Sequence, residues 1–220
     1  MDTAPPPSDI VVPRLRGVSH SVAAVLAVAA ATVVVALAPS GRATFALAVY
    51  GVGLVALFTG SAVYHRWPGP IRFKPLLQRI DHSTIYVFIA ASYTPIVVIA
   101  LHGALAWTIL AIAWAGAAAG VAFAIGWIHA PGPVVAGSYL ALGWVAVIAI
   151  PQLVHSLPLA PLVLLGSGGL MYSLGAVIFM IQRPNPWPRT FGFHEIFHAL
   201  VVAAAAVQYV AIIGWVLPTA

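Results

Sequence analysis

The sequence predicts an all-α integral membrane protein, a bundle of seven transmembrane helices. Of its 220 residues, 62% are hydrophobic and 6% are charged, against roughly 25% charged residues in an average soluble domain. A soluble fold of this size needs more charged side chains to cover its surface. The apolar residues also form continuous runs, each near the length of a membrane-crossing helix. A β-barrel would show alternating segments of about ten residues instead.

Breaks rich in proline and glycine separate the seven runs. The expected spans are 18–38, 43–65, 80–101, 104–127, 134–150, 159–181 and 192–216. The break at His102-Gly103 is short, so the helices that flank it should be antiparallel neighbours. The fifth span is the shortest and ends at Pro151. Pro95 predicts a kink in the third span, with Tyr93 and Thr94 facing the bundle.

Residues 1–16 are expected to form a disordered tail, because prolines are frequent there. Residues 17–220 are expected to form a single seven-helix domain. The first apolar run ends in Ala36-Leu37-Ala38, which resembles the cleavage site of a secretory signal. Its length and Pro39, which would follow the cleaved bond, favour a retained helix.

The basic residues indicate how the bundle is oriented. With the N-terminus in the cytoplasm, only Arg42 lies outside. The residues on the cytoplasmic side are then Arg14, Arg16, Arg66, Arg72, Lys74, Arg79, Arg183 and Arg189. This bias follows the positive-inside rule, and seven spans place the C-terminus outside. The net charge of +5 is therefore explained without nucleic acid as a partner. We expect a multi-pass protein of the plasma membrane whose partners are membrane lipids.

Two acidic residues fall within the expected spans. Asp81 and Glu195 lie near the starts of the third and seventh spans, whereas Asp2 and Asp9 lie in the tail. A charged side chain costs at least ~2.5–3.5 kcal/mol at the centre of a membrane helix, and less near an interface. The presence of a carboxylate in a span therefore requires an explanation.

Histidines accompany these carboxylates at the cytoplasmic ends of the spans. Ser61 and His65 are four residues apart, as are His194 and His198, so each pair shares one helix face. The chain has no cysteine, so a metal must be held by nitrogen and oxygen. Three imidazoles with one open position are typical of catalytic zinc, although Fe²⁺, Co²⁺ and Ni²⁺ also suit such ligands.

The pattern predicts a Zn²⁺ site with His65, His194 and His198 as ligands. Zinc at such a site activates a water molecule and polarises a carbonyl. Asp81 is expected to accept a hydrogen bond from that water as general base, or to bind the metal directly. Ser61 is expected to orient the substrate or to stabilise an oxyanion; alternatively, it only packs between helices.

Other interpretations apply to the remaining polar residues. His-Glu-x-x-His is also a metalloprotease motif, in which Glu195 would be the base. Glu195 lies about 100° around the helix from His194, and it could instead complement the helix dipole as a first-turn acid. His82 is expected to face away from the site. No role is assigned to the histidines at helix ends or in loops, namely His20, His102, His129 and His155.

The same residues resemble the hemolysin III family. The motifs are Ser61-x-x-x-His65, Asp81-His82-Ser83-Thr84-Ile85 running into Ser92-Tyr93-Thr94-Pro95, and His194-Glu195-Ile196-Phe197-His198. The family belongs to a wider group with the progestin and adipoQ receptors and the alkaline ceramidases. The resemblance extends from the first helix to the seventh, with Ala91 in place of a frequent glycine.

The resemblance implies a seven-helix fold with a zinc site near the cytoplasmic face. By that analogy His65, His194 and His198 match the metal ligands, Asp81 matches the carboxylate at the bound water, and Ser61 matches the serine beside it. Three classes of function remain open. They are metal-dependent hydrolysis of a lipid amide or ester, cytolysis or pore formation with structural zinc, and regulation of membrane state as a receptor.

Overall fold

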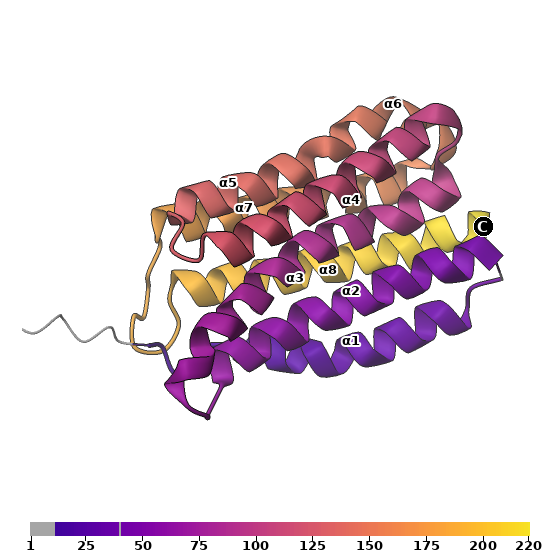
Figure 1. Ribbon diagram of the computed structural model, residues 1–220. Coiled ribbons are helices and arrows are strands. Elements are labelled where there is room, and N and C mark those ends of the chain that lie inside the picture. The colour runs from indigo at the N-terminus through magenta and orange to yellow at the C-terminus, as the bar shows by residue number, and fades with distance from the viewer. Residues whose placement is uncertain (1–11, 40) are drawn as a thin grey trace, which may run out of the picture.

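The computed structural model describes residues 12–39 and 41–220 and is a bundle of long helices (Figure 1). Over these ranges, seven helices are long and apolar enough to cross a membrane. No β-strand occurs in this described part of the chain. The predicted fold class, an all-α bundle of seven membrane-spanning helices, is confirmed. The spans are Val18–Ala36, Gly41–Arg66, Ile71–Ala100, Gly103–Gly126, Gly132–Ser156, Leu159–Ile181 and Phe193–Thr219.

Eight α-helices make up these seven spans, because the fifth span contains two. They are α1 (Val18–Ala36), α2 (Gly41–Arg66), α3 (Lys74–Pro95), α4 (Gly103–Gly126), α5 (Gly132–Gly143), α6 (Ile150–Ser156), α7 (Leu159–Ile181) and α8 (Phe193–Ala211). A 3-10 segment, Trp144–Ala149, joins α5 to α6. The predicted end of the fifth span at residue 150 was therefore wrong. Pro151 lies in the first turn of α6, where a missing backbone N–H costs no helical hydrogen bond.

The third span begins earlier than expected. A 3-10 turn, Ile71–Phe73, leads directly into α3 at Lys74, and Pro75 occupies the first turn of that helix. Asp81 consequently lies about two turns inside α3 rather than at its start. At the other end, Pro95 is followed by a π-helical turn, Ile96–Ala100. Pro95 thus lies at an irregular turn of the helix, and the kink predicted there stays a prediction.

Tyr93 and Thr94 are buried in the bundle, as predicted. The Tyr93 hydroxyl donates a hydrogen bond to the carbonyl of Gly143 at 2.5 Å, and it accepts one from the N–H of Ala146 at 2.7 Å. These groups lie where α5 passes into the 3-10 segment. Since lipid offers no hydrogen bonds to an irregular backbone, Tyr93 stabilises this junction inside the membrane.

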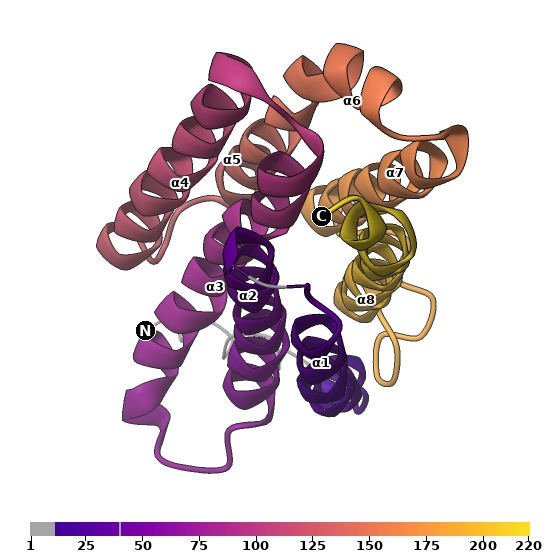
Figure 2. The same ribbon diagram turned by 90° about the vertical axis from the view of Figure 1, so that its right-hand side faces the viewer.

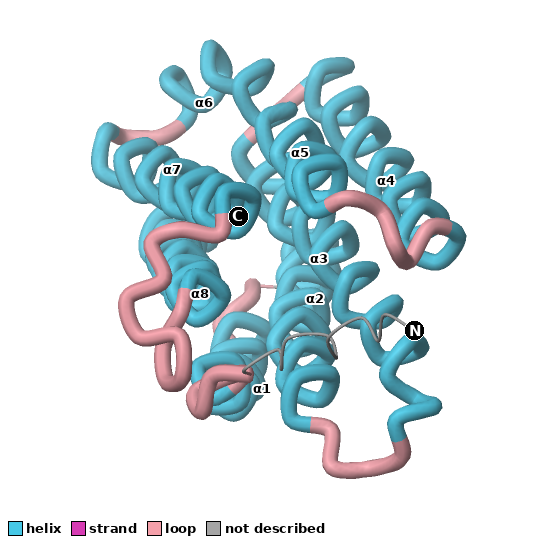
Figure 3. Tube along the Cα trace, turned by 90° about the vertical axis from the view of Figure 1, so that its left-hand side faces the viewer, coloured by secondary structure: helices cyan, strands magenta, loops and turns pink. Residues whose placement is uncertain are grey.

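Neighbouring helices of the chain pack side by side, and α8 also contacts α1 (Figures 2 and 3). The segment before α1, the α2–α3 loop, the α4–α5 loop and the α7–α8 loop gather at one end of the bundle, on the left in Figure 1. This end is the one that the basic residues assign to the cytoplasm. The last turn of α2 and the first turn of α8 therefore lie at the same end.

The outer faces of the helices are as apolar as the interior. On α1, for example, Val22, Val25 and Leu26 are exposed, while Ala23 and Ala27 are buried. A soluble helix bundle would carry charged side chains at such outward positions. Exposed aliphatic side chains around small buried ones are what a lipid environment favours.

Candidate metal centre

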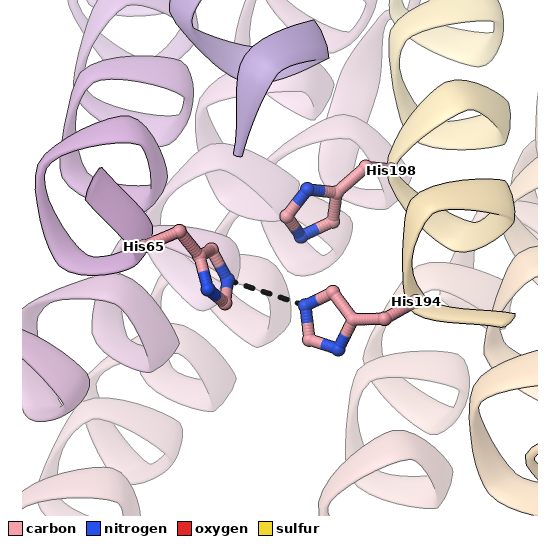
Figure 4. Close-up of side chains that lie close together, drawn as sticks. All are labelled: His65, His194 and His198. Atoms are coloured by element: carbon pink, nitrogen blue, oxygen red, sulfur yellow. Dashed lines mark hydrogen bonds between the residues drawn. The ribbon is translucent and has the colours of Figure 1, made fainter. Parts of the chain in front are cut away.

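Three histidines from two helices meet at the end of the bundle. His65 lies in the last turn of α2, and His194 and His198 lie in the first two turns of α8. One potential ligand atom from each side chain lies within 4.8 Å of those of the other two. Figure 4 shows the three rings converging on one point between α2 and α8. The structure therefore brings together all three residues that the sequence predicted as ligands.

The spacing of one pair of nitrogens, those of His65 and His194, fits a metal ion. Nε2 of His65 and Nε2 of His194 are 3.2 Å apart. Tetrahedral zinc with Zn–N bonds of about 2.0–2.1 Å requires ligand nitrogens about 3.3 Å apart. One nitrogen of His198 also faces the other two rings (Figure 4). Donors of this type and spacing suit zinc and exclude the all-oxygen coordination of calcium or magnesium.

Asp81 and Ser61 lie beside the histidines. The Asp81 Oδ2 atom is 3.9 Å from Nε2 of His65, and the carboxylate is not part of the ligand group. Ser61, one turn before His65 on α2, is buried and lies close to the Asp81 carboxylate. A gap of this length between polar atoms accommodates a bridging water. Both predicted roles of Asp81, partner of a bound water and direct metal ligand, stay predictions.

The end of α2 is fixed by Lys74. Its ammonium group donates a hydrogen bond to the carbonyl of Tyr64 at 2.5 Å and lies over the ring of Tyr64. Carbonyls in the last turn of a helix have no partner within the helix, and a cation there also complements the helix dipole. The first residue of α3 thus holds the turn of α2 that carries His65.

The start of α8 is fixed by Glu195. One carboxylate oxygen accepts a hydrogen bond from the backbone N–H of Gly192 at 2.8 Å, and the other forms an ion pair with Arg16 at 2.5 Å. Both oxygens are therefore engaged, and the side chain is 3% exposed. These contacts support the interpretation of Glu195 as a first-turn acid that complements the helix. They do not support its interpretation as the base of a metalloprotease.

The segment before α1 completes this end of the bundle. The backbone N–H groups of Arg14 and Leu15 donate to the carbonyls of Arg189 and Thr190, at 3.0 and 3.2 Å. Together with the Arg16–Glu195 ion pair, they hold residues 14–16 against the α7–α8 loop. Residues 1–11 of the predicted tail lie outside the described residues.

The sequence interpretation missed one buried residue of the site, His20. It was assigned no role because it stands near the start of a helix. In the structure its ring is 3% exposed and stacks on the ring of His198, with centroids 3.8 Å apart and planes at 8°. A signal was present, because His20 lies at the same end of its span as the other site residues. His102, His129 and His155 are exposed.

Replacing Glu195 by glutamine tests its structural role. The glutamine side chain could still accept from the N–H of Gly192, but the ion pair with Arg16 would be lost. We expect a loss of about 1–3 kcal/mol in the free energy of unfolding, with no loss of bound metal. Thermal unfolding in detergent measures the stability, and metal analysis measures the bound metal.

The Arg16→Gln variant should lose a similar free energy of unfolding. The double variant should lose less than the sum of the losses in the two single variants. Unchanged stability of both the Glu195→Gln and the Arg16→Gln proteins would contradict this structural role.

Comparisons with known proteins show the family of this chain. A family model described as "Haemolysin-III related" matches residues 9–209. The chain is 32% identical to "Hemolysin-3" of Bacillus cereus over 208 residues, which are 93% of this chain and 92% of that protein. It is 29% identical to the "Hemolysin-3 homolog" of Bacillus subtilis (strain 168) over 88% of this chain and 89% of that protein.

A human protein is also similar. The "Monocyte to macrophage differentiation factor" of Homo sapiens is 31% identical over 174 residues, which are 74% of this chain and 67% of that protein. The family match covers α1 to α8 and contains all of the histidines described above. With seven apolar spans and a family match of this extent, the chain is a multi-pass membrane protein and belongs to the haemolysin-III related family.

Proposed function

We propose that this protein is a metal-dependent hydrolase of lipid amides or esters. The observation that carries the proposal is the group of three histidine nitrogens with a buried carboxylate beside it. We propose zinc as the metal, held by His65, His194 and His198. When bound there, Zn²⁺ would supply Lewis-acid chemistry, by activating a water molecule and polarising a carbonyl.

The protein side chains would perform the proton transfer and the positioning. Asp81 is near enough to the histidines to accept a proton from an attacking water, and its burial excludes bulk water from that step. The Ser61 hydroxyl could donate a hydrogen bond to the oxygen of the substrate carbonyl as negative charge develops on it. Both residues lie on the interior faces of their helices.

The surroundings of the histidines favour a lipid as the substrate. The ring centroids of Phe179 and His194 are 5.5 Å apart, and those of Phe197 and His198 are 5.6 Å apart. Aromatic side chains at the end of a membrane bundle suit an acyl chain whose amide or ester group sits near the interface. We propose that this end is the cytoplasmic face of the plasma membrane, as the basic residues indicate.

Metal analysis tests the site itself. We expect about one zinc per chain in protein purified in detergent, because three imidazoles are available as ligands. His65→Ala, His194→Ala and His198→Ala should each lose most of it. His102→Ala is the matched control, since His102 is exposed at the opposite end of the bundle. A wild-type protein without metal in chelator-free buffer would refute the proposed zinc site.

The Asp81→Asn variant tests the reaction. Loss of a general base lowers turnover by a factor of about 10²–10⁴, whereas zinc content should be unchanged because Asp81 is not in the ligand group. The measurement is fatty acid release from a panel of ceramides, acylated amines and phospholipids in mixed micelles. Activity of the Asp81→Asn protein equal to that of wild type on every cleaved lipid would rule out this mechanism.

The names of the bacterial relatives favour a second function, lysis of membranes. Two similar proteins are called "Hemolysin-3" and "Hemolysin-3 homolog". In this alternative the metal would be structural and the helices would disturb the bilayer. Dye release from liposomes at equal protein density distinguishes the two proposals. A hydrolase should release no dye from liposomes of lipids that it does not cleave. Leakage that persists in the Asp81→Asn protein would favour lysis.

A further inference from the structure

We infer that His20 is a fourth histidine of the centre, which binds an oxygen of the ligand by a hydrogen bond and does not bind the metal. The ligand would carry a carboxylate or an amide carbonyl. One polar atom of this group would be held at the three histidines, and His20 would bind a second polar atom beside it. The inference rests on the proposed metal site and adds a ligand-binding residue to it.

The first observation is that the polar atoms of His20 have no partner in the protein. Both nitrogens are buried, and by distance and angle neither forms a hydrogen bond to a residue in the described ranges, although the backbone of His198 lies close to the ring. Burying polar atoms without a partner is unfavourable, and an apolar ring of the same shape would avoid this cost. An imidazole at this position is therefore suited to a partner that comes from outside the chain.

The second observation is the stacking of His20 on His198, which separates their two roles. The lone pair with which an imidazole binds a metal lies in the plane of its ring. The two rings are nearly parallel and their centroids are 3.8 Å apart, so an ion held by a nitrogen of His198 would not also be held by a nitrogen of His20. His20 is accordingly not a member of the ligand group. The ring of His20 nevertheless lies directly beside one member of that group, with its centroid 3.8 Å from the centroid of His198.

The third observation is that His20 is held firmly in place. The edge of its ring meets Phe58, with centroids 5.1 Å apart and planes at 76°. Gly17 begins α1 with a φ of 75°, a conformation that favours glycine. A Cβ atom at Gly17 would lie 2.7 Å from the Cβ of His65, so glycine allows α1 to approach α2 closely. The ion pair of Arg16 then ties the same turn to α8.

Acetate binding to the cobalt-substituted protein tests the inference. Co²⁺ replaces Zn²⁺ at histidine sites and has visible absorption bands that change when an anion binds to it. Acetate carries a second oxygen, like the carboxylate that hydrolysis would release. We expect His20→Phe to bind one Co²⁺ per chain as wild type does, but to bind acetate about five- to ten-fold more weakly, as the loss of one hydrogen bond predicts.

Two further measurements separate ligand binding from packing. His20→Phe keeps the stacked ring and removes the unpartnered nitrogens, so the metal-free variant should unfold at the same temperature as wild type or higher. His20→Gln restores a donor near the position of Nε2 and should recover part of the acetate affinity. His102→Phe is the control and should match wild type in both measurements.

The cobalt and acetate measurements distinguish failure of the His20 inference from failure of the metal site. Equal acetate affinity in wild type and His20→Phe, with cobalt bound in both, would overturn the inference and leave the proposed metal site intact. Loss of cobalt from His20→Phe, as from His65→Ala, would also overturn it, because His20 would then be a metal ligand. Absence of cobalt binding in wild type would refute the metal site and the inference together.

Discussion

The contact between the last turn of α2 and the first turns of α8 is the feature on which the rest of the centre depends. It places the Nε2 atoms of His65 and His194 3.2 Å apart, although 129 residues separate them in the sequence. Neither helix end is held by hydrophobic packing alone. Lys74 binds the Tyr64 carbonyl on one side, and Arg16 binds Glu195 on the other. The charged residues of this chain, few as they are, therefore stabilise the helix ends that carry the histidines.

The position of the centre follows from the properties of the bilayer. In hydrocarbon, backbone groups must be satisfied within the chain, and the helical interior offers no free donors or acceptors. Helix ends leave such groups unpaired, so polar and charged side chains have partners there. Charges also cost less near the interface than at the bilayer centre. The three histidines accordingly lie in the end turns of α2 and α8, at one end of the bundle.

Four histidines meet at one site, where His20 and His198 are buried and His65 and His194 are partly buried. His65, His194 and His198 direct nitrogens toward one point, while the nitrogens of His20 have no partner within the described ranges. A metal ion would satisfy the first three, and a ligand oxygen would satisfy the fourth. One arrangement of the four histidines would then account for binding of the metal, for recognition of a carbonyl or carboxylate, and for lipid hydrolysis. Glu195 contributes to it as a structural residue, since both of its oxygens are engaged by Arg16 and Gly192.

The sequence by itself determined the seven spans, the pairing of His194 with His198 on one helix face, and the common depth of these residues with His65 and Asp81. Each of these follows from local periodicity, from composition or from the distribution of basic residues. The tertiary structure alone decided that α3 starts at Lys74, that the fifth span continues through Pro151 to Ser156, and that His20 stacks on His198. The spacing of residues along one helix is set by its 3.6-residue turn. The distance between side chains on different helices depends instead on how closely the helices pack, as at Gly17 and His65, and no local pattern encodes it.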